Sequence, residues 1–214
     1  MTLVVVVLGA YVRLSDAGLG CPDWPGCFGQ VFAPSDAAER AAVAAHYPDV
    51  EVDSGKAWKE MVHRYLASSL GLVVVVMWFV ALVNRRATPF KTITFLLALI
   101  CFQGALGMWT VTKLLQPAIV TAHLLGGMSV LATFAYLYIK TGASWVVSPH
   151  RRLNQIASIF LVATAVQIAL GGWTSTNYTG LHCPDFPTCQ GQWLPATNFS
   201  EAFTIAAEEG VNYE

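Results

Sequence analysis

Long runs of apolar residues separated by short polar segments dominate this chain of 214 residues. Four runs are long enough to cross a hydrocarbon core of about 30 Å as helices rising about 1.5 Å per residue. They cover residues 60–83, 92–112, 118–139 and 153–174. A fifth run, Leu3–Val12, is too short to cross alone. The pattern predicts an all-α membrane protein whose consecutive spans run antiparallel.

The first apolar run and the loop after it return later in the chain at a constant offset of 162 residues. Gly9 returns as Gly171, and the loop CPDWPGC at 21–27 returns as CPDFPTC at 183–189. A long recurrence of this kind indicates a structural repeat. We therefore expect an antiparallel four-helix bundle with a truncated first span at 1–140, with an outer loop at 13–57. A cytoplasmic linker is expected next, at 141–152. Residues 153–214 would then form the first span and the outer loop of a pseudo-symmetric second bundle.

The composition and the charge pattern place the spans in a bilayer and orient them. Hydrophobic residues make up 55% of the chain and charged residues only 12%, which is typical of a membrane protein. Two loops near 84–91 and 140–152 are basic, whereas all 13 acidic residues lie in 13–60 and 185–214. Because basic loops stay on the cytoplasmic side, both cysteine loops are predicted to be extracytoplasmic. A bacterial plasma membrane fits better than a mitochondrial inner membrane, since no transit-like presequence is seen, and nothing indicates nucleic-acid binding.

Four of the five cysteines form two C-x5-C pairs in the outer loops, Cys21 with Cys27 and Cys183 with Cys189. An oxidising compartment favours two disulfides with these pairings. Spacing alone allows three pairings among four cysteines, and a zinc site with four thiolates would use the same residues. The rings would either stiffen the loops or exchange electrons during turnover. Cys101, within a span, is expected to be a buried small hydrophobic residue.

Each outer loop also contains a short Ala-rich segment that predicts a helix on the membrane surface. These segments are Ser35–Tyr47 and Ser200–Glu209, and each is expected to begin at its serine. Such helices would cover whatever lies beneath them.

Two histidines near the outer ends of parallel spans are the strongest candidates for chemistry. His63 lies 20 residues above Val83 and His123 lies 16 residues above Ile139 (83 − 63 and 139 − 123), or about 30 and 24 Å along a helix. Two imidazoles at matched depth can hold a haem iron from opposite sides. Ala67 and Gly127, one turn below each histidine, leave room for a flat macrocycle, although small residues equally serve helix packing.

Three charged residues accompany these histidines. Glu60 precedes His63 by three positions and so shares its helical face, where a carboxylate could act as a base, a proton relay or a stabiliser of a developing cation. The alternative is an interfacial glutamate paired with Arg64 or Lys59. Arg64 and Arg13 are candidates to neutralise haem propionates, or to extend to lipid headgroups.

Four segments together resemble the haem A synthase family: GAYVRLSDAGLGCPDWPGC, EMVHR with Glu60 and His63, TAHLLGG with His123, and LGGWTSTNYTGLHCPDFPTC. The resemblance covers essentially the whole chain. It implies an eight-span protein of two pseudo-symmetric four-helix bundles, each with a haem site of two histidines.

The resemblance also implies an activity and its residues. Substrate haem O would bind to His63 and His123 and haem b to the second bundle, and a porphyrin methyl group would become the formyl group of haem A for terminal oxidases. Glu60 would be catalytic, and the cysteine pairs would be disulfides. Implied partners are haem O, the farnesyltransferase that makes it, terminal oxidase assembly and the bilayer, with a possible homo-oligomer. The counterpart of His63 is expected near residue 225 (63 + 162), beyond Glu214, so the activity of this chain alone stays open.

Two other functions fit the same pattern. A b-type electron-transfer cytochrome would use the two histidines without oxidising a substrate, and it would not depend on Glu60. A membrane thiol oxidoreductase would have free, cycling thiols in the outer loops and no need for haem.

Overall fold

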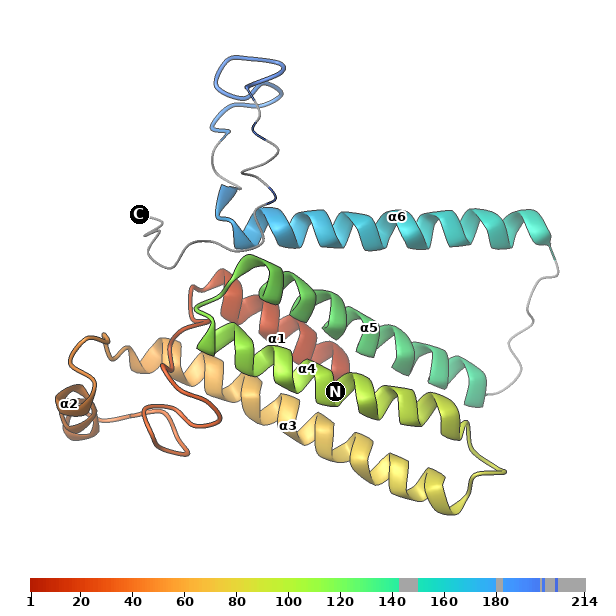
Figure 1. Ribbon diagram of the computed structural model, residues 1–214, viewed down its shortest axis with the longest axis horizontal. Helices are drawn as coiled ribbons and strands as arrows, with labels where there is room; N and C mark the ends of the chain where they lie inside the picture. Colours follow the sequence, from red (N-terminus) through yellow and green to blue (C-terminus); the bar gives the residue numbers. More distant parts are fainter. Residues whose placement is uncertain (143–149, 180–182, 197, 199–202, 204–214) are drawn as a thin grey trace. The chain divides into compact units, whose positions relative to one another are not determined.

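Six helices account for most of the structure, a computed structural model that describes residues 1–142, 150–179, 183–196, 198 and 203 (Figure 1). Four of them, in the described residues, are long and apolar enough to cross a membrane, which confirms the all-α membrane class. The helices are α1 (Thr2–Leu14), α2 (Ala37–His46), α3 (Ser54–Val83), α4 (Phe90–Thr112), α5 (Pro117–Thr141) and α6 (Arg151–Thr176).

The chain divides into two compact units, and the first combines Met1–Leu115 with Gly126–Ser148. Within it α3, orange to yellow in Figure 1, packs against both α1 and α4. Apolar side chains from α3, α4 and the later turns of α5 form the core of this unit: Val74, Ala81, Ile93, Leu96, Val130 and Leu137. Burying this apolar stripe draws the three helices together.

Aspartate caps mark where α2 and α3 begin. Asp53 caps α3, because its carboxylate accepts hydrogen bonds from the amides of Gly55 and Lys56 at 2.8 and 3.1 Å. The bond from the Lys56 amide, with smaller contributions from its neighbours, holds the pKa of Asp53 below its ordinary value. The helix predicted at 35–47 is confirmed as α2, but Asp36 rather than Ser35 is its cap, and its place on the membrane surface stays a prediction.

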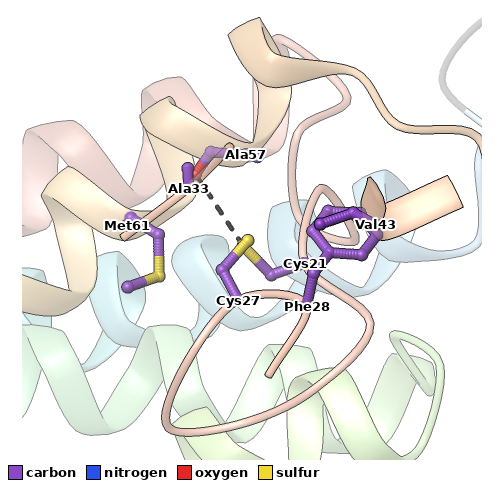
Figure 2. Packing of buried hydrophobic residues seen from close by; sticks show 7 residues of the cluster. All are labelled: Cys21, Cys27, Phe28, Ala33, Val43, Ala57 and Met61. Carbon is purple, nitrogen blue, oxygen red and sulfur yellow. Dashed lines mark hydrogen bonds between the residues drawn. A yellow bond between two sulfur atoms is a disulfide. The ribbon is translucent and has the colours of Figure 1, made fainter. Parts of the chain in front are cut away.

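The loop after α1 folds onto the start of α3 and encloses a second small core. Figure 2 shows this cluster, in which the disulfide lies with Ala57 and Met61 of α3 and Val43 of α2. Both Cys21 and Cys27 are fully buried. The loop is therefore part of the packed structure and not a mobile tether.

The loop after α6 has the same local structure, and it belongs to the second unit, Gln116–Leu125 with Pro149–Glu214. The bridge between Cys27 and Gln30 recurs between Cys189 and Gln192. Both α1 and α6 end at equivalent positions, Leu14 and Thr176 (176 − 14 = 162). The two disulfide loops therefore share one local structure at the offset of 162 residues.

In the second unit the last turns of α6 pack on the first turns of α5. The hydroxyls of Thr121 and Thr176 lie 3.5 Å apart, and Leu124 fits against Gly172, where an added Cβ would lie 2.8 Å from Cδ2 of Leu124. Glycine at 172 thus permits this close helix contact. The predicted helix at 200–209 lies outside the described residues.

Cys101 is exposed, so the expectation of a buried cysteine is wrong. The buried side chains of α4 include Leu96 and Leu106, each five residues away. Five residues turn a helix by about 500°, which puts Cys101 about 140° from both. The cysteine therefore points away from the bundle core.

Candidate functional site

The N-terminal half of α3 brings three predicted site residues together: Glu60, His63 and Arg64. They follow the cap at Asp53 by two to three helical turns. Spacings of three and four residues place them on neighbouring parts of one helix surface. The structure shows that each has a different partner.

Glu60 is buried, with 4% of its surface exposed, and both of its carboxylate oxygens are engaged. Oε2 accepts a hydrogen bond from the backbone amide of Cys21 at 3.0 Å. Oε1 is paired with the guanidinium of Arg64 at 2.5 Å. Glu60 is thus paired with Arg64, one of the two partners considered for it, and its carboxylate also holds the cysteine loop.

Arg64 serves the loop as well as Glu60. Its Nη1 donates to the carbonyls of Gly26 and Asp23 at 2.5 and 3.0 Å, while Nη2 donates to Glu60. Lys59 instead lies over the ring of Tyr11, with Nζ 5.5 Å from the ring centre. Pairing of Arg64 or Arg13 with haem propionates stays a prediction.

His63 lies between α3 and α1, against the backbone at Gly9. A Cβ at Gly9 would lie only 2.9 Å from Cε1 of the imidazole, so only glycine allows this approach. The ring hydrogen-bonds the backbone of Val5, whereas Nδ1 is buried and has no partner among the described residues. A buried imidazole nitrogen without a protein partner fits a residue that ligates a metal. This side chain therefore fits the haem ligand that the sequence predicts.

His123 is half-buried on α5, in the turns that belong to the second unit. Its pairing with His63 across a haem stays a prediction. Of the remaining histidines, His46 and His150 are exposed, and His182 lies outside the described residues.

Gln103 is a polar residue of this region that the sequence analysis did not identify. Its amide lies against the glycines one turn beyond His123, where a Cβ at Gly126 would be 2.1 Å from Oε1 and one at Gly127 would be 3.4 Å from Nε2. An amide within an apolar span was the available signal, because polar side chains inside membranes usually have a function. The small residues below His123 are thus used, at least in part, for contact with α4.

Both cysteine pairs are disulfides, with S–S distances of 2.03 Å for Cys21–Cys27 and 2.00 Å for Cys183–Cys189. The pairing that the sequence favoured is confirmed. The alternative prediction of a zinc site with four thiolate ligands is wrong, since all four cysteines are in disulfides.

An aspartate organises each disulfide loop in the same way. Asp23 accepts hydrogen bonds from the amides of Phe28 and Gly29 at 2.6 and 2.8 Å. Asp185 accepts bonds from the amides of Gln190 and Gly191 at 2.6 and 2.9 Å. The hydroxyl of Thr188, followed by the Gly191 amide, holds the pKa of Asp185 below its ordinary value.

Comparisons with known proteins identify the family of this chain. The family model of the cytochrome oxidase assembly proteins named COX15-CtaA matches residues 1–211. A haem A synthase of Shewanella oneidensis is 46% identical over 206 residues, which is 95% of this chain and 62% of that protein. One from Halalkalibacterium halodurans is 29% identical over 90% of this chain and 62% of its own length, and one from Caulobacter sp. is 30% identical over 98% and 68%. No solved structure matches.

This chain thus spans about three fifths of the length of the first two of these relatives, 62% of each. The family match extends over nearly all of its residues, including the α3 site and both disulfide loops. The chain belongs to the haem A synthase family.

Proposed function

We propose that this chain holds the substrate haem of a haem A synthase reaction, in which a methyl group of haem O becomes the formyl group of haem A. The observation that carries the proposal is the α3 site, where the buried Glu60 and the half-buried His63 lie beneath the first disulfide loop. The relatives named haem A synthase supply the reaction class.

His63 and His123 would bind the iron of haem O in this proposal. The glycine at position 9 supports His63 as a ligand, because it lets the ring sit against α1 with one nitrogen unpartnered and buried. Neutral imidazoles bind iron well, and a fixed second ring nitrogen orients such a ligand. Haem b would belong to the second bundle of the family's eight-span architecture.

Glu60 would act on the reacting edge of the porphyrin. Conversion of a methyl to a formyl group removes four electrons, releases protons and adds one oxygen atom, so the reaction requires an external electron acceptor and an oxygen source. A carboxylate near the reacting carbon can accept a proton or stabilise positive charge. The bonds from Cys21 and Arg64 fix where this carboxylate lies.

The surroundings of the reaction follow from the same proposal. The chain would lie in a bacterial plasma membrane, with both disulfide loops on the extracytoplasmic side and the basic loops in the cytoplasm. It would receive haem O from the farnesyltransferase that makes it and would serve terminal oxidase assembly, with a homo-oligomer as a further possibility. The division into a bundle at 1–140, a linker at 141–152 and a second repeat at 153–214 is part of this proposal.

Haem ligation is tested by absorption spectra of the purified chain in nanodiscs, with pyridine extraction to identify the porphyrin. The wild-type chain should give the low-spin spectrum of a haem with two histidine ligands. The variants His63→Ala and His123→Ala should each lose it, while His46→Ala, on the exposed α2, should keep it. An unchanged spectrum in His63→Ala would refute the proposed ligand.

The catalytic role is tested with Glu60→Gln, which keeps the size of the side chain. We expect the haem spectrum to remain and the conversion of added haem O to haem A, followed by chromatography, to fall by about 100-fold or more, as for loss of a general base. A b-type electron-transfer cytochrome would instead show unchanged electron transfer in this variant. Formation of haem A at the wild-type rate would exclude a catalytic Glu60.

A further inference from the structure

Arg64 links α3 to three parts of the first disulfide loop at once. Nη1 donates to the carbonyls of Gly26 and Asp23 at 2.5 and 3.0 Å, and the carbonyl of Pro25 lies 3.4 Å away. Nη2 is paired with Glu60 at 2.5 Å. The guanidinium is thus shared between the carbonyls of the loop and the carboxylate beside them, an arrangement that suits its planar fork of donors.

Glu60 holds the same loop from its other end. Its Oε2 accepts the amide of Cys21, and the side chain of Arg64 is 12% exposed while that of Glu60 is 6% exposed. The loop backbone also touches the helix backbone directly, because a Cβ at Gly20 would lie 2.6 Å from the carbonyl carbon of Lys56. Two charged side chains and a close backbone contact therefore fasten the loop.

The second loop provides a comparison within the same chain. It has the same bridge and the same aspartate hydrogen bonds, yet Cys183 is exposed, whereas Cys21 and Cys27 are fully buried. The local fold of the loop alone does not bury a disulfide. Burial in the first loop goes with its contacts to α2 and to the outer turns of α3.

We propose that Arg64 is a positioning residue, which clasps the first disulfide loop to α3 and aims the carboxylate of Glu60. We call Arg64, Glu60 and residues 20–26 the clasp. The guanidinium acts on the reaction through Glu60 and the loop, and pairing with a haem propionate is not its main role. This inference rests on the proposed function only for the purpose of aiming Glu60, since the clasp itself is visible without substrate.

The test measures how fast a phosphine reductant opens each disulfide in the intact chain in nanodiscs, by alkylation and peptide mass analysis. In the wild-type chain Cys21–Cys27, whose two cysteines are fully buried, should open much more slowly than Cys183–Cys189, in which Cys183 is exposed. In Arg64→Gln, loss of charge-assisted hydrogen bonds should accelerate opening of Cys21–Cys27 by about tenfold or more. Cys183–Cys189 is the internal reference, and Arg40→Gln, on the exposed face of α2, is the matched arginine control.

Arg64→Lys separates the clasp from a propionate contact. A lysine keeps the positive charge but cannot bridge a carboxylate and two carbonyls with one planar group. We therefore expect Arg64→Lys to open its disulfide nearly as fast as Arg64→Gln, with haem content and spectrum unchanged in both. A propionate partner would give the reverse result, with unchanged disulfide opening, haem lost in Arg64→Gln and haem restored in Arg64→Lys.

The two possible failures are distinguishable. A wild-type chain that binds no haem would refute the proposed function, yet the opening rates would still decide the clasp. Opening of Cys21–Cys27 at the wild-type rate in Arg64→Gln would overturn the clasp, whatever the haem content.

Discussion

Gly9→Ala is the substitution that tests the α3 site most directly. The added Cβ would lie 2.9 Å from Cε1 of His63, 3.5 Å from Nε2 and 3.6 Å from Nδ1. Ordinary contacts begin at 3.4 Å, so the ring must move away from α1 by about 0.5 Å (3.4 − 2.9). A single methyl group would thereby displace the proposed iron ligand, while the histidine itself stays unchanged.

The size of the expected effect follows from how strictly a metal site is positioned. Ligands must be held within about 0.5 Å of their working geometry, and loss of an orienting contact typically costs about 10- to 100-fold in metal affinity. We therefore expect haem affinity to fall by about tenfold or more, with part of the low-spin spectrum replaced by a high-spin one. Helix α1 itself should become more stable, since alanine favours a helix by up to about 1 kcal/mol over glycine.

The assay is haem titration of the purified chain in nanodiscs, with circular dichroism to follow helix content. Gly171→Ala is the matched control, because it occupies the equivalent position in the repeat and a Cβ there meets nothing within 4 Å in the described part of the chain. Both variants gain the same local helix preference, so a difference between them reports the contact with His63. Equal haem affinity and identical spectra in the two variants would refute the assignment of His63 as a ligand placed by α1.

Three further predictions concern other contacts. Gly20→Ala should lift the loop from Lys56 by about 0.8 Å (3.4 − 2.6) and speed reduction of the first disulfide, so an unchanged rate would contradict the backbone contact. Gly126→Ala should lower the unfolding temperature in detergent, since its Cβ would overlap Gln103, at a cost of about 1–3 kcal/mol. Adding Gln103→Ala to this variant should restore the unfolding temperature, and failure of this rescue would argue against the overlap. The pKa of Asp185 is lower in the folded loop than its ordinary value of 3.8. Ionised Asp185 therefore stabilises the loop fully above pH 3.8, and this stabilisation is lost as the pH falls through the pKa of the folded loop. Protection of the amides of residues 190–191 against exchange, measured relative to the intrinsic rate at each pH, should therefore fall in acid. Asp185→Asn should lower this protection at pH 7 but not in acid, and equal protection in both proteins at pH 7 would exclude the effect.

Several features of the protein could be predicted from periodic and local patterns. The four spans follow from the lengths of their apolar runs, and the observed helices extend them by only a few residues, as in α3 from residue 54. The offset of 162 predicted two loops of one design, and they share a bridge and a capping aspartate. Proximity in the sequence and an oxidising compartment favoured the observed disulfide pairs. Each of these properties is set by neighbouring residues or by the bilayer.

The partners of the site residues were decided only by the tertiary structure. Spacing placed Glu60 beside Arg64, but the second partner of its carboxylate, the amide of Cys21, lies 39 residues away along the chain. The contact of His63 with Gly9 and that of Gln103 with Gly126 likewise depend on how helices rotate against each other. The exposure of Cys101 has the same origin, since hydropathy identifies a span but does not fix which face of a uniformly apolar helix turns inward. Long-range packing selects that face, because it depends on the shapes of side chains from several helices at once.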